Sequence, residues 1–267
     1  MTPSVPFAER WFIKMKVCTK TIVCHNIKGG VGKSTAAVNI SYNLSTLGYR
    51  VLGIDLDPQK NYTPFFRKAD ENKTVYDLFG ETKKVRSHIF RSKYENLDII
   101  KGSARLTDML QDSHILSEIL YPVKNRYDYI IIDCRTSNEM LTQNAMVAGD
   151  YLLTPVLLDG YCRDNLADEK EIYDSICYYI GKEMEWGVFA NRVRNKKSQR
   201  EIYIDLTRRH QYPFLDTCIT ERTAVEDALR LRKPLLKHAR NNQVTSDFID
   251  LTKEIILRTG GKCDGRF

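Results

Sequence analysis

The chain lacks the features that mark a membrane protein or a protein of several domains. None of its 267 residues belongs to an apolar run of about 18, the length that a transmembrane helix needs. No stretch rich in proline, serine and glycine divides it, and no repeat is present. With 42% hydrophobic residues, it can bury one large core. We expect one domain over residues 20–267, preceded by an N-terminal extension at residues 1–19.

The chain also lacks a secretion signal and paired cysteines. Residues 1–19 carry Glu9, Arg10, Lys14 and Lys16 in place of the apolar stretch of a signal peptide. The 7 cysteines are odd in number, and none belongs to a C-x-x-C pair. Such cysteines are typical of free thiols in a reducing compartment. The expected location is therefore the cytoplasm.

A glycine-rich segment at residues 27–35 is typical of a phosphate-binding loop. The general pattern is G-x-x-x-x-G-K-[ST], and Gly32, Lys33 and Ser34 supply its second half. Ile27 occupies the first glycine position, so the loop departs from the pattern there. Glycines let main-chain N–H groups approach a phosphate chain. The residues expected to contact nucleotide are Gly29, Gly30, Val31, Gly32, Lys33, Ser34 and Thr35.

The flanking segments predict the strand–loop–helix unit that this motif requires. Residues 21–24 are a short apolar run suited to a buried strand. After the loop, apolar residues recur at helical spacing until Gly48, which is a helix-stop signal. We therefore predict that the chain binds ATP with Mg²⁺. Lys33 should reach the β- and γ-phosphates, and the Ser34 hydroxyl should bind Mg²⁺.

Two further apolar runs, residues 51–55 and 129–133, predict parallel strands buried on both faces of a sheet. Ligands of open α/β sheets bind beyond the carboxyl ends of the strands, so Asp57 and Asp133 should lie near the phosphate loop. Asp133 would hold Mg²⁺ through a water. Asp55 could act there or hold the loop backbone. The predicted fold is α/β, a mostly parallel, doubly wound sheet with helices on both faces.

Lys28 is a second lysine in a loop whose phosphates Lys33 already serves. One interpretation is a solvated loop charge. The other, which we favour, is a group that reaches the nucleotide of a second subunit, like an arginine finger supplied in trans.

Three segments resemble the ParA/MinD family of deviant Walker A ATPases, and its ParA partition ATPases above all. The similarity runs in element order from Lys20 to Arg258. The segments are residues 28–35, residues 51–61 with the pattern D-x-D-P-Q-x-N, and residues 127–134, which look like the family's Walker B strand.

The resemblance implies a cycle of ATP-dependent dimerisation. ATP would join two subunits into a homodimer, with Lys28 of each reaching the other's nucleotide. Asp57 would join Ser34 and Asp133 near Mg²⁺ and orient the attacking water, while Lys33 holds the phosphates. Hydrolysis would be slow and stimulated by a ParB-like adaptor protein, which would release the ATPase from nucleoid DNA.

The chain departs from the family after Asp133. Family members usually continue with C-P-P-S, and here the segment is Cys134, Arg135, Thr136 and Ser137. This segment is a nucleotide-sensing switch in the family, so the timing of hydrolysis stays open. Cys134 also invites comparison with the nitrogenase iron protein, which shares the fold and bridges a dimer with an iron–sulfur cluster. No second ligand cysteine is evident, so we expect no cluster.

The net charge of +7 is unevenly placed, because residues 191–200 and 230–240 are rich in lysine and arginine and contain no acidic residue. Such clusters are typical of a polyanion partner, and the resemblance implies DNA bound without sequence preference. A solvated basic surface is the alternative. The candidate DNA contacts are Arg194, Lys196, Lys197, Arg222 and Lys233.

Asn191 and Arg192 follow an apparent strand at residues 186–190. The resemblance implies that this pair lies beside the adenine. A strand-end asparagine that is hydrogen-bonded to backbone is an equally good interpretation.

Three other functions are consistent with parts of the sequence. A MinD-like membrane ATPase needs a C-terminal amphipathic helix, but the pattern at residues 248–256 predicts a helix packed on the core, and we expect no membrane binding. A P-loop kinase or ligase would need a small-molecule acceptor pocket, which the sequence does not show. A scaffold without ATPase activity is disfavoured because Lys33, Ser34, Asp57 and Asp133 are all present.

Overall fold

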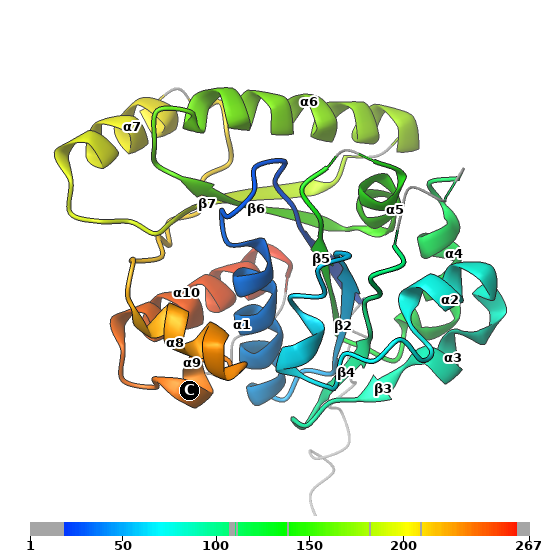
Figure 1. Cartoon of the computed structure of the whole chain (residues 1–267). Helices are drawn as coiled ribbons and strands as arrows, with labels where there is room; N and C mark the ends of the chain where they lie inside the picture. The colour runs from blue at the N-terminus through cyan, green and yellow to red at the C-terminus, as the bar shows by residue number, and fades with distance from the viewer. Residues whose placement is uncertain are drawn as a thin grey trace, which may run out of the picture.

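The computed structural model describes residues 19–106, 110, 112–137, 139–181, 183–208 and 210–260. All of the expected N-terminal extension except Thr19 lies outside them. These residues form a seven-stranded sheet of order β3-β4-β2-β5-β1-β6-β7, shown in Figure 1. Neighbouring strands are parallel, except that β3 runs antiparallel to β4. The predicted doubly wound, mostly parallel sheet is therefore confirmed.

The predicted strands appear close to the expected positions. Every residue of the two central strands β2 and β5 is buried, as their uninterrupted apolar runs require. The strands are β1 (Lys20–Cys24), β2 (Val51–Leu56), β3 (Phe90–Arg91), β4 (Leu97–Ile100), β5 (Tyr129–Cys134), β6 (Tyr151–Leu157) and β7 (Glu185–Asn191).

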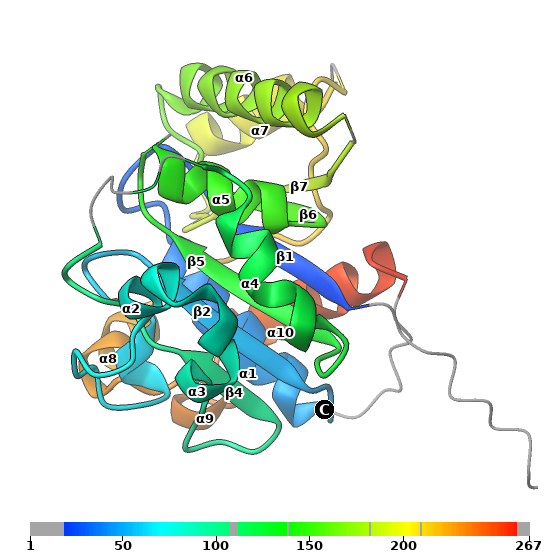
Figure 2. The same cartoon turned by 90° about the vertical axis from the view of Figure 1, so that its right-hand side faces the viewer.

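Helices cover both faces of the sheet (Figures 1 and 2). On one face an apolar core joins the strands to α1 (Lys33–Thr46), α8 (Ala224–Leu231), α9 (Leu235–His238) and α10 (Gln243–Arg258). The other face packs against α2 (Val75–Gly80), α3 (Val85–His88), α4 (Ile115–Lys124), α5 (Met140–Ala148) and part of α6 (Cys162–Ile180).

A third apolar cluster joins α7 (Lys197–Arg208) and the start of α6 to strands β6 and β7. Only Leu206 of α7 is buried, so most of this helix faces solvent. Short 3₁₀ turns lie at Thr63–Phe65 and Thr82–Lys84. No helix in the described part of the chain is long and apolar enough to span a membrane.

The sheet places the acidic residues side by side. Asp133 of β5 pairs in register with Cys24 of β1 on one side and with Asp55 of β2 on the other. The loop after β1 leads directly into α1, which ends just before Gly48, where φ is +88°. The expected strand–loop–helix unit and its stop signal are thus present.

Candidate nucleotide-binding site

A cavity of about 860 Å³ opens at the carboxyl ends of the central strands. Its walls come from the loop before α1, the segments after β2 and β5, the end of β7, and the region around α8. Residues from each wall include Gly30, Lys33, Ser34, Asp57, Gln59, Arg135, Thr136, Asn191, Arg192, Arg222, Val225 and Arg232. The fold therefore brings together segments that are far apart in the sequence.

The phosphate loop has the backbone geometry that its glycines allow. Gly30 and Gly32 have φ angles of +72° and +102°, which other residues rarely adopt. Gly32 precedes the first residue of α1 and carries no capping side chain, so the first N–H groups of the helix stay available for phosphate. A Cβ at Gly32 would lie 2.2 Å from Asn191 Nδ2, so this position has no room for another residue.

Asn191 fastens the end of β7 to this loop. Its Nδ2 donates a hydrogen bond to the Val31 carbonyl at 2.6 Å, and its Oδ1 accepts one from the Arg192 N–H at 2.9 Å. Asn191 and Arg192 both line the cavity. The side chain of Asn191 is thus hydrogen-bonded to backbone, and it holds the phosphate loop against the end of β7.

Lys33 extends along the loop and is buried. Its Nζ donates to the carbonyl oxygens of Asn26 at 2.9 Å and Lys28 at 3.1 Å. Burial lowers the pKa of Lys33 from its ordinary value, and the nearby Asp133 carboxylate opposes this shift. Bound phosphate would favour the charged form in the same way.

Asp133 is a fully buried carboxylate beside the loop. Burial and the neighbouring Asp55 raise its pKa well above the ordinary value. Ser34 lies near enough to lower that pKa, yet the two side chains do not form a well-aligned hydrogen bond, and both carboxylate oxygens lack a partner among the described residues. A buried carboxylate without partners fits a residue that holds a hydrated cation.

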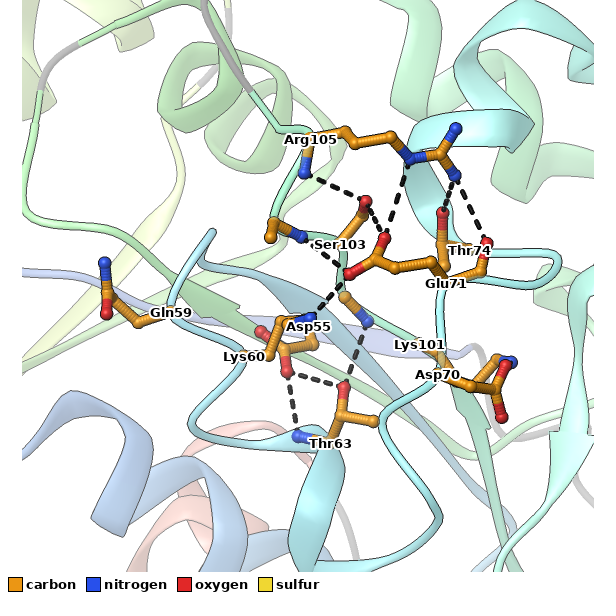
Figure 3. A network of polar contacts seen from close by, with 12 residues as sticks. Asp55, Gln59, Lys60, Thr63, Asp70, Glu71, Thr74, Lys101, Ser103 and Arg105 are labelled. Carbon is orange, nitrogen blue, oxygen red and sulfur yellow. Dashed lines mark hydrogen bonds and ion pairs between the residues drawn. The ribbon is translucent and has the colours of Figure 1, made fainter.

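Asp55 has a different environment. Its Oδ2 accepts hydrogen bonds from Thr63 N at 2.8 Å and Thr63 Oγ1 at 2.6 Å (Figure 3). Its Oδ1 accepts one from Asp57 N at 3.2 Å. Burial, opposed by these hydrogen bonds, raises the pKa of Asp55 to about 6. These contacts assign Asp55 to holding both ends of the segment that carries Asp57.

Lys28 points away from the loop's own cavity. Its Nζ donates to Asp159 Oδ2 at 2.7 Å and lies 5.6 Å from the centre of the Tyr161 ring. Both partners follow β6 and precede α6, so Lys28 is held by its own chain.

Two buried residues beneath the loop were not singled out from the sequence. His25 Nδ1 lies 2.8 Å from Glu169 Oε1, and both side chains are fully buried. Glu169 Oε2 also accepts the Ile27 N–H at 3.1 Å, directly before Lys28. No local pattern could have indicated this pair, because Glu169 lies on α6, 144 residues further along the chain.

The candidate DNA contacts occupy two neighbouring exposed regions, at the start of α7 and around α8. The backbone at Val193 pairs with that at Thr220, which brings the two regions together. The run at residues 191–200 does have acidic neighbours. Arg194 contacts Glu221 from another segment, and Lys197 lies 3.8 Å from Glu201, which directly follows the run on α7. The five candidates, all exposed, are Arg194, Lys196, Lys197, Arg222 and Lys233.

A glycine loop that opens a helix, a buried lysine and a carboxylate on the adjacent strand define a P-loop nucleotide-binding protein. A family model described as "AAA domain" matches residues 19–177. The sporulation initiation inhibitor protein Soj of Bacillus subtilis is 30% identical over 247 residues, which cover 88% of this chain and 98% of Soj.

Solved structures agree on the fold. A plasmid partition protein from Borrelia burgdorferi bound to AMPPNP superposes with a TM-score of 0.77, at 22% identity over 90% of this chain and 99% of that one. The cell division ATPase MinD of Pyrococcus furiosus gives 0.76, at 23% identity over 90% and 99%. The chain belongs to the ParA/MinD family, and it is an ATPase of the partition and positioning type.

Proposed function

We propose that this ATPase binds ATP with Mg²⁺, dimerises around it, and in that state binds DNA without sequence preference. A ParB-like adaptor would stimulate hydrolysis and release the protein from the nucleoid. One observation carries the DNA step. Arg192, Arg222 and Arg232 are exposed and line the mouth of the cavity that Lys33 enters, so the basic surface and the nucleotide site share a wall.

The residues of the site would divide the work of hydrolysis. Lys33 and the N-terminus of α1 would bind the phosphates, and Ser34 and Asp133 would hold Mg²⁺, which neutralises charge on the phosphate oxygens. Asp57 would orient the attacking water, and Lys28 would leave Asp159 to reach the partner subunit's nucleotide. Among the described residues no three acidic, histidine or cysteine side chains are grouped to hold a metal, which suits an ion shared with phosphate and water.

A salt titration with two unrelated duplexes, in ATP and in ADP, tests the DNA step. The slope of log affinity against log salt should be about −0.9 for each phosphate neutralised. Both duplexes should bind alike and only with ATP, because a dimer presents its two basic surfaces together. The double substitution Lys196→Glu and Lys197→Glu should weaken both equally and leave ATP binding intact.

A matched control is available on the opposite side of the molecule. Lys83 and Lys84 are also adjacent and exposed, near α3, while α7 lies at the far end of the molecule in both views (Figures 1 and 2). Changing both to Glu alters the net charge by the same amount and should leave DNA affinity within about twofold at matched salt. Equal weakening by the two double substitutions would mean that only net charge matters.

The membrane alternative requires an amphipathic helix that is free to bind lipid. In α10 the apolar residues Phe248, Leu251, Ile255 and Ile256 are all buried in the core. For α10 to insert into a membrane, these four side chains would have to leave the core. Binding to anionic vesicles, with no binding to either duplex, would favour a MinD-like function instead.

A further inference from the structure

Asp57 sits in a tight turn that contains a strained residue. The Lys60 N–H donates to the Asp57 carbonyl at 2.9 Å, and the Gln59 N–H donates to Asp57 Oδ1 at 2.9 Å. Lys60 has a φ of +53°, in the left-handed region that favours glycine. A lysine keeps such a conformation only when its surroundings hold it there.

Glu71 supplies such a contact. Lys60 Nζ lies 2.5 Å from Glu71 Oε1 (Figure 3). Glu71 is itself fixed, because its Oε2 accepts Ser103 Oγ at 2.5 Å and its Oε1 accepts the Ala104 N–H at 3.1 Å. Burial opposes ionisation of Glu71, but the hydrogen bonds from Lys60, Ser103 and Ala104 lower its pKa to about 2.

The backbone on either side of Glu71 is bound to the end of β4. Lys101 follows β4, has a side chain that is 2% exposed, and donates to Asp70 Oδ1 at 2.5 Å and to the Asn72 carbonyl. Arg105 extends the network to Asp77 at 2.7 Å, which closes the capping box of α2 with Thr74. The contacts that hold Glu71 in place therefore come from the segment after β4 and the start of α2, and none that the structure describes comes from the phosphate loop (Figure 3).

The turn is thus held at three points. Asp55 binds its start at the Asp57 N–H and the chain beyond it at Thr63. Between these two anchors, the Lys60 side chain reaches Glu71. Asp57, Gln59 and Lys60 all line the nucleotide cavity, so a change in the turn changes what faces the phosphates.

We propose that Glu71 is a positioning residue for Asp57: its ion pair with Lys60 holds Lys60 in the left-handed conformation and so fixes the direction of the Asp57 carboxylate. This inference rests on the proposed role of Asp57 in hydrolysis. A misplacement of about 1 Å in a catalytic group can lower a rate on the order of a hundredfold. Binding of ATP, which depends on the phosphate loop, should change little.

The test separates turnover from binding. Glu71→Gln should lower kcat about tenfold and leave KM for ATP and the affinity for a non-hydrolysable ATP analogue within about twofold. Lys60→Met should have the same effect, and Lys60→Arg, which keeps the ion pair, should restore most of the turnover. The control is Glu81→Gln, because Glu81 forms a similar ion pair with Lys84 at 3.0 Å outside this network.

A double substitution shows whether Glu71 acts through Lys60. Glycine adopts the left-handed conformation without strain, so Lys60→Gly should retain part of the turnover without the ion pair. In that background Glu71→Gln should have no further effect on kcat. An equal loss with and without Lys60→Gly would overturn the proposal, as would a wild-type kcat in Glu71→Gln.

Amide hydrogen exchange gives a readout that does not depend on ATPase activity. In Glu71→Gln, a peptide covering residues 57–62 should exchange faster than in the wild type and in Glu81→Gln, while the phosphate loop is unchanged. Unchanged exchange in that peptide contradicts the proposal that Glu71 holds the Asp57 turn. If the wild type turns over no ATP, the proposed function fails, and the exchange measurement still decides whether Glu71 holds the Asp57 turn.

Discussion

Lys28 Nζ lies 2.7 Å from Asp159 Oδ2 of its own chain. Both side chains are partly exposed, at 28% and 41%, so the pair contributes only about 0.2–1 kcal/mol. A contact of this strength can hold Lys28 in the monomer and is readily exchanged for a phosphate. The geometry is therefore compatible with a lysine that changes partner when two subunits meet.

Lys28 and its partner should have opposite effects on dimerisation. Lys28→Ala should bind ATP as a monomer, without an ATP-dependent dimer and without turnover. Asp159→Asn should strengthen the ATP-dependent dimer by up to about fivefold, because no ion pair has to be broken first. Light scattering with ATP and Mg²⁺ measures both. A dimer with full turnover in Lys28→Ala means that the lysine is only a loop charge.

Substitutions of Lys33 and of Asp57 should have different effects on ATP binding and on ATP hydrolysis. Lys33→Ala should weaken ATP binding on the order of a hundredfold or more, since it removes the buried amine of the phosphate loop. Asp57→Ala should spare ATP affinity and slow turnover about a hundredfold. Titration with a fluorescent ATP analogue and a phosphate-release assay distinguish the two, and normal ATPase activity in Lys33→Ala refutes the site assignment.

Arg135 should distinguish ATP from ADP. It follows Asp133 by two residues, lines the cavity, and has its Nη1 2.5 Å from Glu139 Oε2. A cation at this place can respond to the γ-phosphate, so Arg135→Ala should slow turnover about tenfold or more and reduce the preference for ATP over ADP. The exposed Arg86 on α3 serves as the control. Equal nucleotide preference in Arg135→Ala and the wild type rules out this role.

Glu71 should affect stability in acid. Its pKa is about 2 in the folded chain, although burial opposes this, and about 4.3 in an unfolded one. A lowered carboxylate pKa stabilises the fold above pH 4.3, and this contribution is lost as the pH falls toward 2. The side chain is 39% exposed, so the discounted contribution is about 1 kcal/mol. Urea unfolding at pH 6 and pH 3.5 should show a smaller loss in Glu71→Gln than in the wild type.

Removing one partner of the buried His25–Glu169 pair should destabilise the fold more than replacing both partners. Glu169→Leu alone leaves His25 and the Ile27 N–H without their partner, so the free energy of unfolding should fall by about 3–5 kcal/mol. The double substitution His25→Ala and Glu169→Leu also removes the imidazole and leaves only the Ile27 N–H without its partner, so it should lose less. Urea unfolding at pH 7 gives both values, and equal losses would show that the pairing itself contributes nothing.

The parallel strands and the phosphate loop were predictable because their signals are local. Continuous apolar runs predicted β2 and β5 nearly to the residue. The rule that ligands lie beyond the strand ends correctly predicted Asp57 in the wall of the cavity and Asp133 buried near Lys33. The roles of Lys28, Asp57 and Asp133 in hydrolysis and of the basic residues in DNA binding stay predictions. Residues 1–18 and 261–267 lie outside the described structure.

The sequence by itself determined which chemistry is available: a glycine loop with two lysines, and carboxylates that follow buried strands. Only the tertiary structure decided which groups are paired. Lys28 and Asp159 are 131 residues apart, and His25 and Glu169 are 144 apart. The acid-free run at residues 191–200 likewise acquires Glu221 as a neighbour. Phosphate-loop chemistry follows from consecutive residues, whereas ion pairs depend on which helices the sheet brings together, and no local pattern encodes that.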